Sequence, residues 1–145
     1  MDPDVRVEPV EDQPAADAVR AELERRIIAF NEAVTGHHDG RTLTFVVREQ
    51  GAIVAGLDGF TWGGYARIEY LFVDESHRGR GLGSALMDAA LREARARDCD
   101  AITVDTHEFQ APAFYERLGF GRVGTTLGTP RGSAEHRYWK RLDDA

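Results

Sequence analysis

The sequence predicts a single α/β domain over residues 1–145, with a central mixed β-sheet of six or seven strands flanked by helices. Three observations carry this prediction. Strand-like residues 68–73, helix-like residues 82–97 and strand-like residues 101–104 follow one another as in a βαβ unit, whose strands are parallel neighbours. Residues 42–57 have the pattern of an antiparallel hairpin. A chain of 145 residues also fits one ordinary core.

The N-terminal third predicts one helix. Residues 1–14 are acidic and contain three prolines, so they form either a frayed tail or, at 5–7, an edge strand. Residues 15–33 carry apolar side chains near helical spacing and end before Gly36, which indicates a helix with one buried stripe. His37 and His38 follow in a turn. No second ligand cluster stands at metal-site spacing, so we expect no metal.

The remaining segments complete the sheet. Residues 42–48 and 52–57 turn at Gln50-Gly51, a second turn is expected at Asp58-Gly59, and residues 65–74 form the central strand. Residues 82–97 place an apolar stripe on one side of a helix. A short helix is expected at 112–118, and the last strands at 120–123 and 136–142.

The run from Arg78 to Ser84 lies between the central strand and the following helix, and its composition predicts an anion site. Gly79, Gly81 and Gly83 allow positive φ and close backbone approach to a ligand. The unpaired N–H groups of the first helical turn, together with the helix dipole, favour a negative charge there. Arg78 and Arg80 add two permanent cations. A phosphate or pyrophosphate is the expected ligand.

Two common nucleotide motifs fit this run poorly. A P-loop ends in Gly-Lys-Ser/Thr, whereas the single lysine of this chain is Lys140. The dinucleotide fingerprint needs a third glycine, and Ser84 stands at that position, although Asp98 or Asp100 could serve as its acidic residue.

Two motifs resemble the GNAT superfamily of acetyl-coenzyme A-dependent N-acetyltransferases. Arg78-x-x-Gly81-x-Gly83 resembles the family's pyrophosphate motif. Residues 109–120 resemble its second motif, Ala-x-x-x-Tyr-x-x-x-Gly-Phe, with Tyr115 at the tyrosine. Many members carry asparagine seven residues before that tyrosine, and Glu108 stands here.

The resemblance implies acetyl-coenzyme A as co-substrate, with no metal. It implies that the loop binds the pyrophosphate, and that the backbone of the preceding strand binds the pantetheine arm where two strands splay apart. The side chains of these residues can vary. The implied cofactor-binding residues are Leu71, Phe72, Val73, Arg78, Gly79, Arg80, Gly81, Leu82, Gly83 and Ser84.

Amide formation from a thioester needs a base for the ammonium, a donor for the oxyanion and an acid for the thiolate. The resemblance implies Tyr115 as the acid; a packing role is the alternative. Glu69 interrupts an apolar strand, where a carboxylate is costly unless paired or functional, so it is a candidate base or a group that binds the amine. His107 is the rival base and Asp105 a lesser one.

Trp62 and Tyr65 are the candidate substrate-binding residues. They lie in the aromatic and glycine-rich segment 60–65, which the resemblance places beside the acceptor pocket with residues 129–138. An aromatic face can bind a cation, and Trp62 can equally pack on Phe60.

The composition of the chain bears on its binding partners and on the cellular compartment in which it works. A net charge of −7 argues against nucleic acid, which binds basic patches. Cys99 is the single cysteine and forms no internal disulfide, and no apolar run approaches the ~20 residues that span a bilayer. The first residues lack the layout of a signal peptide. We therefore expect a cytoplasmic protein without a membrane partner; a homodimer stays open.

The function expected from this resemblance is acetyl transfer from acetyl-coenzyme A to a primary amine of a small molecule or peptide. Two alternatives stay open. The chain could be an acyl-coenzyme A-binding module without turnover, or it could transfer an acyl group to a hydroxyl.

Overall fold

The computed structural model describes residues 2–143, and its internal contacts divide into two compact units, one up to His38 and the other from Asp39 onward. The first unit contains α1 (Gln13–Thr35), which begins after Asp12, whose carboxylate accepts a hydrogen bond from Ala15 N at 2.9 Å. It ends at Gly36, whose φ of 73° is left-handed. Residues 5–11 form neither helix nor strand, so the edge strand considered for this segment is absent.

The apolar stripe of α1 has no partner within its own unit. Its larger side chains are exposed, and Leu23 keeps 61% of its surface accessible. Within residues 2–38 no other helix or strand packs on the stripe, so its burial stays a prediction. The exposed stripe residues are Val19, Leu23, Ile27, Phe30 and Val34.

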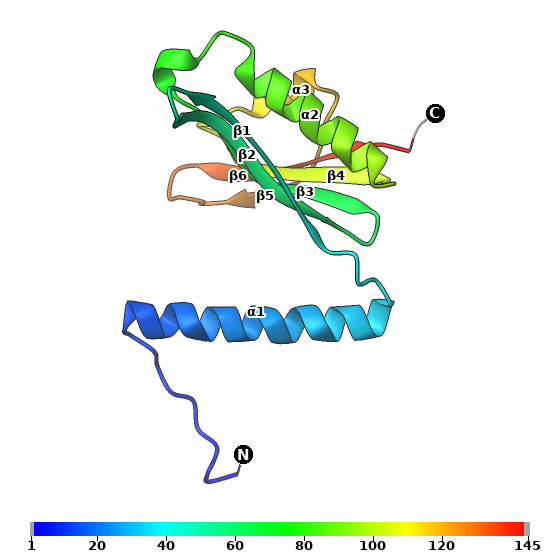
Figure 1. Ribbon diagram of the computed structural model, residues 1–145. Helices are drawn as coiled ribbons and strands as arrows, with labels where there is room; N and C mark the ends of the chain where they lie inside the picture. The colour runs from blue at the N-terminus through cyan, green and yellow to red at the C-terminus, as the bar shows by residue number, and fades with distance from the viewer. Residues whose placement is uncertain (1, 144–145) are drawn as a thin grey trace. The chain divides into compact units, whose positions relative to one another are not determined.

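The second unit contains one mixed six-stranded sheet in the order β1-β2-β3-β4-β6-β5 (Figure 1). The parallel pair is β3 (Tyr65–Val73) and β4 (Ala101–His107), as the βαβ pattern predicted. All other neighbours are antiparallel. The remaining strands are β1 (Arg41–Glu49), β2 (Ala52–Trp62), β5 (Gly121–Leu127) and β6 (Ala134–Arg141). The α/β fold with a mixed sheet flanked by helices is confirmed.

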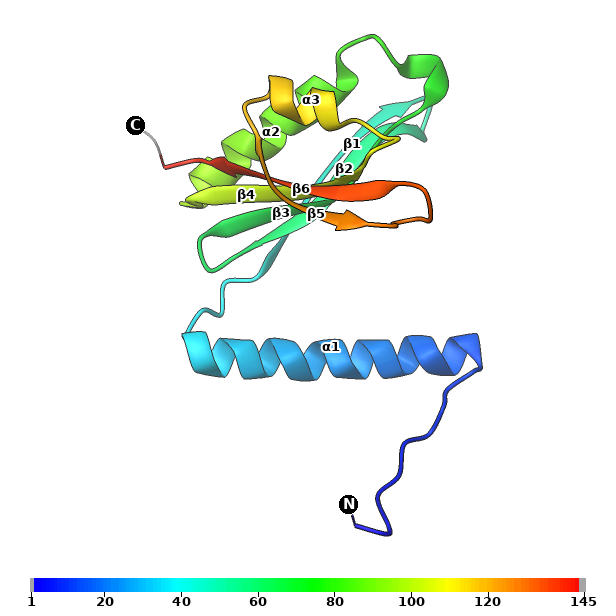
Figure 2. The ribbon, with the colours of Figure 1, turned by 180° about the vertical axis from the view of Figure 1, so that it is seen from behind.

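Two helices of this unit cover the same face of the sheet (Figures 1 and 2). They are α2 (Leu82–Ala96) and the short α3 (Pro112–Arg117). The predicted stripe of α2 is buried and packs on sheet residues such as Ile68 and Ile102. Each fully buried side chain of this size contributes about 1.5–3 kcal/mol. We call the other face of the sheet, which neither helix of this unit covers, the open face.

A bulge alters β3 near its middle. Asp58 pairs with Tyr70 and Gly59 with Ile68, so Glu69 has no partner in β2. Gly59 lies inside β2 rather than in the turn expected from the sequence. A glycine is needed at this position because the backbone of β3 passes close to it. A Cβ there would lie 2.0 Å from the carbonyl oxygen of Arg67.

The two parallel strands pair only over their first halves. Their register runs from Tyr65 with Ala101 to Ile68 with Val104 and then stops. Beyond the bulge, β4 supplies no ladder partner to residues 69–73 of β3. The two strands therefore splay toward their carboxyl ends, which lie at the same edge of the sheet.

Candidate functional site

The carboxyl ends of β3 and β4 bring the glycine-rich loop and His107 to one edge of the sheet, which is where α/β folds place ligands. The loop follows the one-turn helix η1 (Glu75–His77). Gly79 and Gly81 both have φ of 78°, a left-handed conformation that a side chain strains. A Cβ on Gly81 would meet no atom within 4 Å. These two glycines are needed for backbone shape, not for packing.

The start of α2 has the character of an anion site. No side chain caps the helix, so the N–H groups of its first turn, which includes Leu82 and Ser84, keep their donor capacity for a ligand. Arg78 and Arg80 are exposed, and Arg78 Nε donates a hydrogen bond to the Val73 carbonyl at 3.1 Å. Two guanidinium groups therefore flank the uncapped turn.

A histidine that sequence reasoning missed ties this loop to the β1–β2 hairpin. His77 Nε2 lies 2.7 Å from Glu49 Oε2, and its Nδ1 lies 2.9 Å from Ser76 Oγ. Hydrogen bonds from Ser76 and then from His77 lower the pKa of Asp74. Glu49 and His77 are 28 residues apart, so no local pattern could have revealed the contact.

The predicted acid lies beneath the loop in α3. Tyr115 is 5% exposed, and its ring contacts Phe114, Phe120 and Tyr138 with centroid separations of 5.1–6.2 Å. Phe114 also lies 3.5 Å from the position of a Cβ on Gly83, which links α3 to the loop. Burial raises the pKa of Tyr115 to about 12, so the hydroxyl is protonated at neutral pH.

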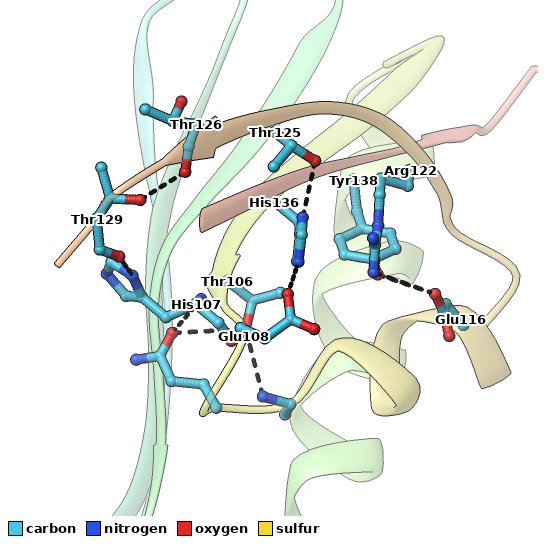
Figure 3. Close-up of polar contacts among 12 residues, drawn as sticks. Thr106, His107, Glu108, Glu116, Arg122, Thr125, Thr126, Thr129, His136 and Tyr138 are labelled. Carbon is cyan, nitrogen blue, oxygen red and sulfur yellow. Dashed lines mark hydrogen bonds and ion pairs between the residues drawn. The ribbon is translucent and has the colours of Figure 1, made fainter. Parts of the chain in front are cut away.

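The two candidate bases differ in their surroundings. Glu69 lies at the bulge and is exposed, so its carboxylate is not buried among the apolar residues of its strand. His107 ends β4 and is half-buried. Its Nδ1 lies 2.7 Å from the Thr129 carbonyl oxygen, which can only accept, so Nδ1 carries the proton (Figure 3). Nε2 is then the basic nitrogen of the neutral ring, and it lies 3.3 Å from the Glu135 carboxylate.

Asp105, the third candidate, is engaged by arginines. Arg137 donates to both of its oxygens, at 2.8 Å and 3.0 Å, and Arg67 donates to one at 3.2 Å. The Arg137 bond, more than any other contact, lowers the pKa of Asp105. A carboxylate held this way is a weak base.

A second polar network lies on the face that α3 covers. His136 is 3% exposed; its Nε2 contacts the Glu108 carboxylate and its Nδ1 lies 2.8 Å from Thr125 Oγ1 (Figure 3). The bond from His136 lowers the pKa of Glu108. Glu108 is the residue that departs from the family motif, and this departure was the only sequence signal of the pair.

Trp62 and Tyr65 lie at the other end of the strands. Both flank the β2–β3 turn at the amino end of β3, with ring centroids 6.2 Å apart in an edge-on contact. The expected role of both residues in binding the acceptor stays a prediction. Tyr65 lies within electrostatic range of Arg137, whose pKa is raised first by the bond to Asp105 and to a lesser degree by Tyr65.

Metal binding and membrane insertion were the subjects of two further expectations. Within residues 2–143, no group of three or more histidine, cysteine, aspartate or glutamate side chains is arranged to hold a metal ion. Over the same residues, no helix is long and apolar enough to cross a membrane.

Comparison with known proteins finds acetyltransferases among families, sequences and solved structures alike. The model of the acetyltransferase (GNAT) family matches residues 6–120. The acetyltransferase Atu2258 of Agrobacterium fabrum is 36% identical over 86% of this chain and 93% of its own length. The blasticidin-S acetyltransferase of Streptomyces morookaense is 37% identical over 68% of this chain and 74% of its own. The crystal structure of a putative acetyltransferase from Agrobacterium tumefaciens superposes with a TM-score of 0.80, at 32% identity, over 95% of this chain and 98% of that one.

Proposed function

Because the chain belongs to the acetyltransferase (GNAT) family, we propose that it transfers the acetyl group of acetyl-coenzyme A directly to a primary amine of a small molecule or peptide. The observation that carries the proposal is the anion cradle at the splayed ends of β3 and β4. It combines two left-handed glycines, an uncapped helix start and two arginines. These features suit a pyrophosphate.

The donor would lie along the splay. Arg78, Arg80 and the backbone from Gly79 to Ser84 would bind the pyrophosphate. The backbone of Leu71 and Val73, unpaired by β4, would bind the pantetheine amides, and the N–H of Phe72 or Val73 would face the thioester. A strand edge without a ladder partner is a ready surface for an extended ligand with amide groups.

The surroundings of His107 suit a general base better than those of Glu69 do. The Thr129 carbonyl fixes its tautomer, which leaves Nε2 to take a proton from the acceptor ammonium. The Glu135 carboxylate beside Nε2 can accept a hydrogen bond from the proton that Nε2 takes. Glu69, exposed at the bulge, would attract the ammonium before it reacts.

After the ammonium has lost its proton, the reaction passes through a tetrahedral intermediate that then releases coenzyme A. The free amine attacks the thioester carbonyl, and a backbone N–H stabilises the oxyanion. The oxyanion collapses and the carbon–sulfur bond breaks; the thiolate accepts a hydrogen bond from Tyr115 and takes the proton that the positively charged nitrogen of the intermediate loses as the amide forms. A phenol with a pKa of about 12 is a weaker acid than a thiol of pKa ~8.5, which makes full transfer unfavourable by ~5 kcal/mol before ligand binding. Tyr115 therefore acts mainly by donating a hydrogen bond to the departing sulfur.

A panel of amines separates this function from its alternatives. The protein is mixed with acetyl-coenzyme A and each amine, free thiol is followed by a colour reagent, and products are identified by mass. The proposal predicts one N-acetylated amine for each thiol released. Binding of acetyl-coenzyme A with no thiol release for any acceptor would mean a binding module. A product that hydroxylamine cleaves would be an ester, and would mean transfer to a hydroxyl.

A further inference from the structure

The open face of the sheet carries a polar depression of about 410 Å³ next to the candidate base. Asp105, Arg137 and Glu135 line it from β4 and β6, and residues 123–126 of β5 complete its wall. The Glu135 carboxylate is the group that faces His107 Nε2 at 3.3 Å. A molecule in this depression would thus lie beside the residue that is proposed to deprotonate the acceptor.

One side of the depression is positively charged. Arg67, Asp105 and Arg137 form a bonded trio of two cations and one anion, with a net charge of +1. Asp105 stays ionised because its bond from Arg137, foremost among its contacts, lowers its pKa. The pairing with Asp105 leaves part of Arg137 free for another contact, since 49% of its side chain remains exposed. Its guanidinium can therefore donate to an anion as well as to Asp105.

The other side of the depression is negatively charged. Glu135 stands opposite His107 in the β4–β6 register, and Arg137 stands opposite Asp105 two residues along. Two residues of a strand span about 7 Å. A carboxylate and a positively charged trio therefore lie side by side, separated by roughly the length of a small amino acid.

We propose that this depression is the acceptor site, and that the acceptor is a small hydrophilic amine that also carries an anionic group, either a carboxylate or a phosphate. The anionic group pairs with Arg137, which lines the depression, while the ammonium lies beside Glu135 and His107 Nε2, which takes its proton. This inference rests on the proposed acetyl transfer. A neutral amine offers no anionic group to the exposed part of Arg137, and a diamine places its second cation against that guanidinium, so both are poorer acceptors.

Matched amines test the charge requirement directly. Butylamine is compared with 4-aminobutyrate, and ethanolamine with phosphoethanolamine, which distinguishes a carboxylate from a phosphate. The measurement is kcat/KM from thiol release, with products confirmed by mass. A charge-assisted hydrogen bond is worth ~1.5–3 kcal/mol, so one anionic member should exceed its neutral partner by ~10- to 100-fold.

Arg137→Gln should reduce that preference to less than threefold, because it leaves Asp105 paired with Arg67 alone and the cluster neutral. Arg141→Gln is the matched control. Arg141 lies on the same strand and the same face, 60% exposed, and pairs with Asp143 outside the depression. The control should keep the full preference for the anionic amine.

A direct binding measurement separates the two proposals. Saturation-transfer NMR with the better anionic amine should show contact with the wild-type protein and with Arg141→Gln, and should lose it with Arg137→Gln. Such binding without thiol release would support the acceptor site and contradict acetyl transfer. Thiol release with equal kcat/KM for neutral and anionic amines would refute the acceptor site and leave acetyl transfer intact. Contact that survives in Arg137→Gln would refute it as well.

Discussion

Replacing Gly81 by alanine should weaken coenzyme A binding far more than it weakens the fold. The φ of Gly81 is 78°, and a non-glycine residue in the left-handed region costs about 1–2 kcal/mol. No atom lies within 4 Å of the added Cβ, so this strain is the whole stability cost. In the proposed cradle the same Cβ would stand where the pyrophosphate approaches the backbone, and the backbone strain would shift the N–H groups that bind it. We expect a loss in coenzyme A affinity of ~10-fold or more.

Gly51→Ala is the control for this experiment. Gly51 lies in the β1–β2 turn with φ of 82° and also has no atom within 4 Å of an added Cβ. Both variants should therefore lose a similar free energy of unfolding in urea titrations. Calorimetric titration with coenzyme A should show weaker binding for Gly81→Ala alone. Equal affinity in Gly81→Ala and the wild-type protein would refute the anion cradle.

The remaining predictions concern single side chains. Tyr115→Phe should lower kcat by ~10- to 10⁴-fold while keeping coenzyme A affinity, and because its pKa is about 12 we expect the lower part of that range; unchanged turnover would reduce it to a packing residue. His107→Gln should lose the acidic limb of the pH dependence of kcat/KM, with partial recovery at high pH as more amine deprotonates unaided, whereas Glu69→Gln should keep the limb; the reverse pattern would make Glu69 the base. Asp105 has a lowered pKa in the folded protein, so its pairing with Arg137 stabilises the fold above the unfolded value near 3.8 and is lost as pH falls through the folded value. Asp105→Asn should therefore flatten the fall in melting temperature below about pH 4, and an unchanged slope would contradict the pairing.

Local patterns predicted the parts of the site that are built locally. The glycines, the uncapped turn and the stripe of α2 depend on spacing within one segment, and each is found where the sequence placed it. The pairing of β3 with β4 also followed from the βαβ pattern, because a crossover of that length favours parallel strands.

Features that depend on register could not be predicted in the same way. Asp58-Gly59 has the composition of a turn, yet β2 runs through it because Gly59 fits against the backbone of β3. Glu69 lies at the same bulge and is exposed, although its neighbours in the sequence are apolar. One residue of slip decides which face a side chain occupies, and the sequence does not carry that information.

Contacts between distant segments were missed altogether. His136 meets Glu108, and His77 meets Glu49, each across 28 residues. Arg137 reaches Asp105 across 32 residues, and this pairing both weakens Asp105 as a base and forms one side of the depression that we propose for the acceptor. Each partner alone is an ordinary charged residue, and only the strand order brings them together.

Calorimetric titration of the purified protein with acetyl-coenzyme A tests the central claim most directly. The anion cradle predicts saturable binding of one acetyl-coenzyme A per chain, and a melting temperature that rises with its concentration by mass action. No detectable heat at millimolar acetyl-coenzyme A, together with saturable binding of ATP or NADH, would contradict it.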